Sequence, residues 1–439
     1  MNPVLFISVD CLRADHLGCY GYDRPTSPNI DSFADTATVF EHAYSNCPGT
    51  RWAFQSLHTG VSTLQIDGLG IPEEYCPLAS YFSDHGYATG GFAVNGFVSR
   101  DYRYDTGFDT YYSVQDSSDQ HGLLGRAGQA INDTLNSDLV LEKVLRPVRE
   151  KLRSSQTGKG NRFQPSHSDR DTVDQALSFV DDHQNEAYFL WVHLMDAHTP
   201  YGYWPDHLEA LRGDADIEHT IHPGQEELIE QGEEPPQNVI DTYDAGVRST
   251  DEQIGRLLNV IPDNATVVLT GDHGEEFGRF GDFHDASLYG SMTQVPIIIR
   301  TPGIEIGRSQ TPAQHLDIPP ALLHAANIEA PEAWEGEPLQ ISERTVDEPI
   351  YHTLGKDKIA VREGDWKYIE SEGSGELYRA PHSEIEEEPA DDPDQRDKLR
   401  TLANEYRASA GSAGAGASEL GEGDLSDEVE GNLEDLGYL

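Results

Sequence analysis

Residues 265–275 read Ala-Thr-Val-Val-Leu-Thr-Gly-Asp-His-Gly-Glu, and this stretch decides the fold. Its first five residues are typical of a buried strand, and the strand ends where Asp272 and His273 stand side by side. Residues 3–9 form a similar apolar run that ends at Asp10. Because open α/β sheets bind ligands at the carboxyl ends of their strands, the two segments predict one metal site in a single large domain.

Strand-like and helical patterns alternate around these two segments. Apolar runs at 88–94, 187–192 and 294–300 are typical of further buried strands, and amphipathic spacing over 172–182 and 238–258 predicts helices. This alternation predicts an α/β fold with a central, mostly parallel sheet flanked by helices.

The pattern of apolar and polar residues changes after about residue 340. Short strand-like runs at 349–352, 358–362 and 366–369 precede a helical pattern at 395–407. We therefore expect a small C-terminal subdomain over 341–407, made of an antiparallel sheet and a helix.

The remaining boundaries follow from composition. We expect a catalytic domain over residues 1–340 with polar insertions at 114–170 and 206–237. Residues 408–439 consist mostly of Gly, Ser, Ala and acids, with few core formers, which predicts a disordered acidic tail.

The chain is strongly acidic, with 78 Asp and Glu against 30 Lys and Arg and a formal net charge of −48. An acidic surface repels nucleic acid and can steer cations inward. It also keeps a protein soluble at very high salt, where repulsion between carboxylates is screened. We favour the second interpretation, which predicts a halophilic source, and we expect no nucleic-acid partner.

Cysteine usage and the N-terminus bear on the cellular compartment. The four cysteines form no Cys-x-x-Cys pair and are too few for a disulfide framework: Cys11, Cys19, Cys47 and Cys76. The N-terminus lacks a basic, apolar leader pattern, and no apolar run reaches about 18 residues. These features predict a cytoplasmic protein without a membrane span.

Two further segments carry residues suited to chemistry. In residues 46–60, Gly49 precedes Thr50 at a predicted helix start, where backbone N–H groups and the helix dipole suit an oxyanion, although Thr50 is also an ordinary helix cap. Residues 193–201, directly after a predicted strand, contain Asp196 and His198, whereas we expect His193 to be a core or surface residue.

Together these segments resemble the sulfatase branch of the alkaline-phosphatase superfamily, with an atypical nucleophile motif. The resemblance covers about residues 3–405 and rests on residues 9–31, 78–89, 244–258, 272–275, 295–298 and 361–378. It implies an alkaline-phosphatase-like fold and a metal-dependent ester hydrolase.

The resemblance implies a divalent metal bound by Asp10, Asp272 and His273, with the oxygen of the nucleophile as another ligand. Many sulfatases have two adjacent acids where this chain has Asp10 and Cys11, and many have Asn where this chain has His273. One acid fewer and one imidazole more favour Mn²⁺ or Zn²⁺ over Ca²⁺, which prefers six to eight oxygen ligands.

Two alignments of the nucleophile motif are open. Sulfatases carry Cys or Ser in a Cys/Ser-x-Pro-Ser-Arg pattern, with the Cys oxidised to formylglycine. Placing Cys47 in that slot aligns Arg51 with the motif Arg but puts Gly49 where Pro belongs. Anchoring on the Thr-Gly pair at 59–60 puts Thr50 in the slot instead. We favour Thr50, with Arg51 serving from a shifted position, and do not expect formylglycine at Cys47.

The resemblance also implies roles for two histidines, His198 and His284. In relatives, a His after the mid-chain strand and a basic residue after the Asp-His-Gly motif contact the ester oxygens or protonate the leaving group. In two-metal relatives these regions hold a second metal, which here would use Asp196, His198 and His284.

Three functions remain open on these grounds. The first is hydrolysis of sulfate esters, with a small-molecule or carbohydrate ester as substrate. The second is a phosphodiesterase, phosphonate monoester hydrolase or phospho-group transferase built from the same parts. The third is an inactive homologue that binds anionic glycans. The sequence does not predict the oligomeric state.

Overall fold

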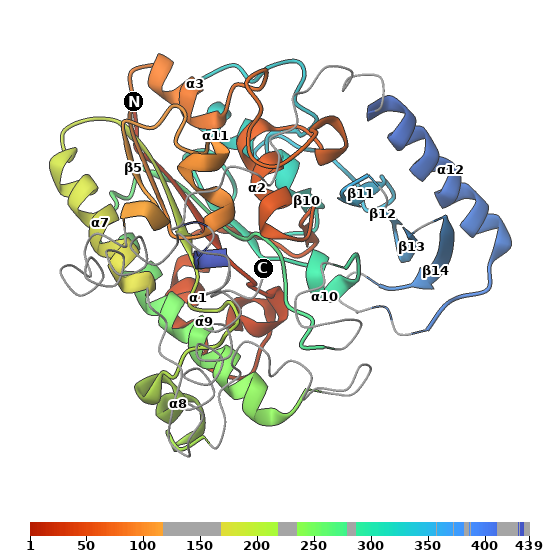
Figure 1. Cartoon of the computed structure of the whole chain (residues 1–439), viewed down its shortest axis with the longest axis horizontal. Helices are drawn as coiled ribbons and strands as arrows, with labels where there is room; N and C mark the ends of the chain where they lie inside the picture. The colour runs from red at the N-terminus through yellow and green to blue at the C-terminus, as the bar shows by residue number, and fades with distance from the viewer. Residues whose placement is uncertain are drawn as a thin grey trace, which may run out of the picture.

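The molecule is built on one large sheet (Figure 1). A computed structural model describes residues 1–116, 168–217, 235–278, 287–356, 358–371, 373–381, 386, 388–410, 429 and 431–433. Within these residues the main sheet has eight strands in the order β5-β4-β6-β1-β7-β8-β2-β9. The bounds are β1 Val4–Val9, β2 Thr38–Phe40, β4 Ala88–Ala93, β5 Thr110–Tyr112, β6 Tyr188–Leu194, β7 Thr266–Gly271, β8 Ile297–Arg300 and β9 Gly307–Ser309.

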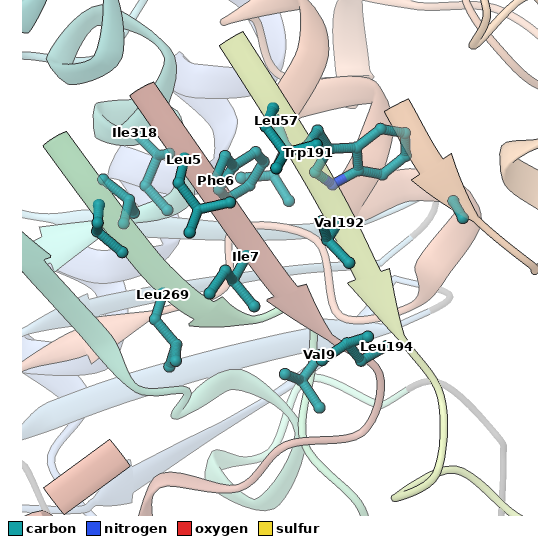
Figure 2. Packing of buried hydrophobic residues seen from close by; sticks show 14 of the residues in the cluster. Leu5, Phe6, Ile7, Val9, Leu57, Trp191, Val192, Leu194, Leu269 and Ile318 are labelled. Atoms are coloured by element: carbon teal, nitrogen blue, oxygen red, sulfur yellow. The ribbon is translucent and has the colours of Figure 1, made fainter. Parts of the chain in front are cut away.

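The five strands from β5 to β7 in this order are parallel, whereas β8 runs antiparallel to both of its neighbours. β1 is the central strand, and every one of its residues is buried. Figure 2 shows its apolar side chains packed between those of β6 and β7. A strand covered on both faces needs a continuous apolar run, which explains the sequence pattern of residues 3–9.

Helices cover both faces of this sheet. Successive residues of a strand point to opposite faces. On one face, Phe189 of β6 stacks on Phe82 of α3, with 4.3 Å between the ring centroids. On the other face, α7 lies over β4 and β6: Gly90 of β4 pairs with Leu190, and a Cβ atom at Gly90 would meet the ring of Phe179 of α7. The helices are α1 Pro28–Ala34, α2 Thr50–Thr59, α3 Leu78–Asp84, α7 Asp169–Asp182, α8 Pro205–Arg212, α9 Gln237–Leu258, α10 Gly290–Thr293, α11 Ile318–Ala325 and α12 Pro393–Ala410.

A second, smaller sheet lies to one side of the main sheet (Figure 1). Its strands, β11 Ile350–Leu354, β12 Lys358–Glu363, β13 Trp366–Ser371 and β14 Ser374–Arg379, pair antiparallel in chain order. α12 covers it through Leu399 and Ala403. A short parallel pair, β3 Ala43–Tyr44 and β10 Ala313–Gln314, completes the described sheets. The predicted fold class, a mostly parallel central sheet with a small C-terminal antiparallel sheet, is confirmed.

The structure differs from the prediction in two places. The strand predicted over 294–300 begins only at Ile297, after Pro296, which has no N–H for a sheet ladder. Within the segment predicted to be a disordered acidic tail, the side chains of Val429 and Leu433 are buried in the main core, and the prediction for the tail as a whole stays a prediction.

Other predictions of domain organisation stay predictions. Much of the two insertions, residues 117–167 and 218–234, lies outside the described residues, and α8 begins the second insertion. Among the helices that the structure describes, none is long and apolar enough to cross a membrane.

Candidate active site

The carboxyl ends of four neighbouring parallel strands bring polar side chains together. Asp10 follows β1, Asp272 follows β7, Asn95 lies two residues after β4, and His193 is the penultimate residue of β6. Because parallel strands end at the same edge of a sheet, residues distant in sequence become neighbours.

Asp10 is the centre of this cluster. Its Oδ2 accepts a hydrogen bond from Nδ2 of Asn95 at 3.2 Å and lies 3.4 Å from Nε2 of His193, while Oδ1 lies 3.5 Å from Nε2 of His273. Burial raises the pKa of Asp10, but the imidazoles of His198, His193 and His273 outweigh it and hold the pKa well below its usual value. Asp10 is therefore a fully buried carboxylate whose imidazole neighbours favour the ionised form.

Asp272 has one satisfied and one unsatisfied oxygen. Oδ1 accepts the backbone N–H groups of His273 at 2.7 Å and Cys11 at 3.3 Å. Oδ2 is buried, accepts no hydrogen bond from the part of the chain that the structure describes, and lies 3.7 Å from Nε2 of His273. Burial and the Asp10 carboxylate raise the pKa of Asp272 to about 6.

These side chains fit a divalent metal. One ligand atom from each of Asp10, Asp272 and His273 lies within 4.8 Å of the others, and all three residues are buried. A cation would offset the repulsion between the two carboxylates and provide a partner for the orphaned Oδ2 of Asp272.

Cys11 and His198 form a second group of potential ligands with Asp10, again within 4.8 Å. Cys11 has a left-handed backbone with φ of 57°, and its thiol donates to Oδ1 of Asp10 at 3.3 Å. Burial, and then the carboxylate of Asp10, raise the pKa of the Cys11 thiol. The free Cys11 is therefore a neutral thiol that supports Asp10.

Thr50 lies beside the same cluster, but it comes from a helix and not from a strand end. It is the first residue of α2, after Gly49, whose φ of 150° is rarely adopted by residues with a side chain. The Thr50 hydroxyl lies 3.4 Å from Oδ2 of Asp10 and 3.2 Å from Nε2 of His273. The hydroxyl therefore lies close to two potential metal ligands and to the positive end of the α2 helix dipole.

The Cys47 sulfur has different neighbours. It lies 3.3 Å from the hydroxyl of Thr63, 3.4 Å from that of Thr353 and 3.6 Å from that of Ser56. The side chain is buried. The described contacts of the Cys47 sulfur are therefore with neutral hydroxyls, whereas the Thr50 hydroxyl contacts a carboxylate and an imidazole.

The other predicted catalytic residues are placed as follows. The guanidinium of Arg51 lies over the ring of Trp52 at 3.8 Å and 6.0 Å from the ring of Phe97. Nε2 of His198 lies 3.9 Å from Oδ1 of Asp10, while Nδ1 contacts the carbonyl oxygen of Thr199. Burial lowers the pKa of His198 despite the Asp10 carboxylate, which favours the neutral imidazole.

The second metal site stays a prediction. The carboxylate of Asp196 accepts the Ser249 hydroxyl at 2.6 Å and the backbone N–H of Asp169 at 3.0 Å. Asp196 belongs to neither group of potential ligands among the described residues. His284 lies outside those residues.

Sequence reasoning did not assign His193 and Asn95 to the site. Nδ1 of His193 lies 3.2 Å from the Ser8 hydroxyl, so its two ring nitrogens connect β1 to the Asp10 carboxylate. The available signal was positional: each is a polar residue at the carboxyl end of an apolar strand.

Comparisons with known proteins identify the family. The sequence model of the family described as Sulfatase matches residues 2–328. An uncharacterised sulfatase of Escherichia coli is 26% identical over 364 residues, which cover 76% of this chain and 69% of that protein. Human iduronate 2-sulfatase is 24% identical over 342 residues, covering 68% of this chain and 60% of that protein, which is less than two thirds of its length.

Solved structures show the same fold. A protein named Ps i-CgsB, in complex with k-i-k-neocarrahexaose, aligns with a TM-score of 0.69 at 17% identity and covers 99% of this chain and 97% of that one. The phosphonate monoester hydrolase of Silicibacter pomeroyi aligns with a TM-score of 0.64 at 18% identity, covering 94% and 96%. Sulfatases are in general metal-dependent, and the described site has residues suited to a metal. The chain belongs to the sulfatase family of ester hydrolases.

Proposed function

We propose that the chain is a metal-dependent hydrolase of sulfate esters that uses the hydroxyl of Thr50 as its nucleophile. The observation that carries the proposal is the position of that hydroxyl, 3.4 Å from Asp10 and 3.2 Å from His273 at the start of α2. A nucleophilic hydroxyl needs an activating neighbour, and the buried cluster around Asp10 supplies one.

Asp10, Asp272, His273 and Thr50 would hold the metal, for which Mn²⁺ and Zn²⁺ are favoured and Ca²⁺ is the third candidate. When bound, such an ion lowers the pKa of a coordinated hydroxyl and offsets negative charge on the ester. The protein's own task is to keep two carboxylates ionised and close together, and the surrounding histidines do so for Asp10.

The reaction has two steps. Thr50 Oγ1 releases its proton to water and forms a bond to sulfur as the bond from sulfur to the ester oxygen breaks, so that the alcohol leaves and a sulfate ester remains on Thr50. Water then attacks the sulfur of this ester, the bond from sulfur to Thr50 Oγ1 breaks, and sulfate leaves while Thr50 Oγ1 takes up a proton. The N-terminus of α2 and the Arg51 guanidinium would stabilise the sulfuryl oxygens, since both carry positive charge.

The leaving alcohol needs a proton. His198 is the described candidate, because its imidazole lies 3.9 Å from Asp10 and, once protonated, would be held by that carboxylate. His284 remains a candidate for the same role on the basis of the family resemblance alone.

The single hydroxyl of Thr50 leaves open a second candidate function, hydrolysis of phosphate or phosphonate monoesters. Thr50 carries one hydroxyl, whereas formylglycine hydrate carries two and can release its ester by elimination. A Thr ester must instead be cleaved by water, a route that phosphoryl chemistry uses as readily as sulfuryl chemistry. The fold shared with a phosphonate monoester hydrolase is compatible with this candidate.

The substrate class and the compartment are part of the proposal. A carbohydrate sulfate is favoured, since Ps i-CgsB, which shares the fold, was solved with a neocarrahexaose. The net charge of −48 supports a halophilic enzyme that works at high salt, and the proposed location is the cytoplasm.

The test uses purified protein loaded with Mn²⁺ or Zn²⁺ and three aryl esters: sulfate, phosphate and phosphonate. We expect the sulfate to turn over fastest, Thr50→Ala to abolish turnover and Cys47→Ala to retain it. Faster turnover of phosphate or phosphonate would select the second function. A metal-loaded protein that binds sulfated glycan without any turnover would select the inactive homologue.

A further inference from the structure

Part of the acidic C-terminal segment packs against the main domain. Residues 411–439 contain eight Asp and Glu and no Lys or Arg. Nevertheless, Val429 and Leu433 are 0% and 1% exposed and belong to the main hydrophobic core. Figure 1 shows this blue helical turn over the main domain, well away from α12 at the right. We call Val429 and residues 431–433 the terminal turn.

The terminal turn contacts one loop in particular, η4 Gly96–Val98. The backbone N–H of Gly96 donates to Oδ1 of Asn432 at 2.8 Å. A Cβ on Gly96 would lie 2.8 Å from Cγ of Leu433, closer than real Cβ atoms approach a neighbour. A side chain at position 96 would therefore have to displace Leu433, and the hydrogen bond from the Gly96 backbone to the Asn432 side chain joins the two segments.

The loop connects this contact to the site. Asn95 precedes η4, is fully buried, and accepts the N–H of Phe97 at 2.9 Å through its Oδ1. That bond turns the amide so that Nδ2 donates to Oδ2 of Asp10 at 3.2 Å. Asn95 thus holds the orientation of the Asp10 carboxylate, and its own orientation depends on the loop that the terminal turn covers.

We propose that the terminal turn is a positioning element of the active site, which holds the loop at 95–98 so that Asn95 orients Asp10 for metal binding. The inference rests on the proposed function, because it takes Asp10 as a metal ligand. Groups that orient metal ligands typically change metal affinity by roughly 10- to 100-fold when they are removed.

The first experiment compares two truncations of the full chain. A stop after Ala410 removes the terminal turn but leaves α12 complete, and a stop after Leu433 removes only residues 434–439. Titration calorimetry with Mn²⁺ alone, and hydrogen exchange of residues 93–98, are measured for both. We expect the shorter chain to bind Mn²⁺ about 10- to 100-fold more weakly and to exchange faster over 93–98, and the longer chain to match the full protein.

A second experiment covers the case in which the shorter chain fails to fold. Gly96→Ala introduces the clash with Leu433, and Leu433→Ala removes the side chain that it meets. We expect Gly96→Ala alone to weaken Mn²⁺ binding and to speed exchange over 93–98, and the double variant to recover part of both. Equal effects of the single and double variants would overturn the proposal.

These readouts separate the inference from the proposed function. Mn²⁺ affinity and hydrogen exchange are measurable whether or not any ester is hydrolysed. Unchanged exchange over 93–98 in both the shorter chain and Gly96→Ala would overturn the positioning role, whatever substrate the enzyme uses. Loss of turnover by Thr50→Ser with normal exchange would count against the proposed nucleophile alone.

Discussion

The hydroxyl oxygen of Thr50 lies 3.2 Å from Nε2 of His273, so the start of α2 meets the end of β7 at one point. The contact joins a helix N-terminus to a strand end 223 residues away in the chain. Asp10 contacts both partners, which makes the three side chains a single unit. The chemistry of the site depends on this meeting point.

The Thr50 hydroxyl is the first target for mutation. Thr50→Val keeps the shape of the side chain but removes the oxygen, so we expect kcat to fall by at least about a thousandfold, whereas Thr50→Ser keeps an attacking oxygen and a measurable rate. Steady-state kinetics with an aryl sulfate measures both. Thr63→Val is the matched control beside Cys47, and a loss there equal to that of Thr50→Val would count against Thr50.

Replacement of Asp272, the carboxylate with the orphaned Oδ2, should have opposite effects on thermal stability with and without metal. Asp272→Asn relieves the repulsion with Asp10, so the metal-free variant should unfold at the same temperature as the wild type or higher. It should also lose the stabilisation by metal, which for the wild type is about 2.7 kcal/mol at a hundredfold excess over Kd. Thermal unfolding with a chelator and with Mn²⁺ measures this.

The control for that experiment is another buried carboxylate, Asp251, which accepts the backbone N–H groups of Asn29 and Ile30. Asp251→Asn should be less stable under both conditions and keep the full metal shift. A metal shift that persists in Asp272→Asn would exclude Asp272 as a ligand.

Metal affinity should depend on pH. Burial, together with Asp10, raises the pKa of Asp272 to about 6, and the carboxylates of Asp272 and Asp10 outweigh burial to raise the pKa of His273. Since ligands bind metal in their deprotonated forms, protons compete as the pH falls through 6, and affinity should drop by roughly tenfold per pH unit for each proton displaced. Mn²⁺ titrations at pH 5, 6 and 7 check this, and a constant affinity would contradict it.

A buried ion pair of the small C-terminal subdomain lies against α10 of the main domain. Nζ of Lys367, on β13, lies 2.9 Å from Oε1 of Glu386 and 3.1 Å from the Thr293 hydroxyl of α10, and both charged side chains are fully buried. Lys367→Met leaves the Glu386 carboxylate without this partner, and we expect a loss of about 3–5 kcal/mol in the free energy of unfolding.

Lys398→Met is the matched control, because Lys398 pairs with Glu363 while its side chain is 53% exposed. Its loss should be at most about 1 kcal/mol. Denaturant unfolding of both variants measures the difference, and similar small losses would show that the buried pair does not stabilise the fold.

Much of the architecture was readable from the sequence because central parallel strands are buried on both faces. The apolar runs before Asp10 and Asp272 predict β1 and β7, and the shared edge of parallel strands predicts that the two acids meet. The direction of β8 was not readable, since an apolar run has the same appearance in either direction.

The remaining features depend on tertiary contacts. Asn95 and His193 differ from ordinary strand-end residues only because their neighbours in the sheet place them beside Asp10. The terminal turn has two apolar residues, Val429 and Leu433, in an acidic segment. Two apolar residues are too weak a pattern to predict a buried helical turn where the composition favours disorder. His284 and the second metal site stay predictions.

The most direct test is mass spectrometry of the peptide that contains both Cys47 and Thr50, taken from metal-loaded enzyme quenched in acid during turnover of an aryl sulfate. The account predicts an unmodified thiol at Cys47 and a sulfate ester on Thr50. Formylglycine at Cys47 together with an unmodified Thr50 would contradict it.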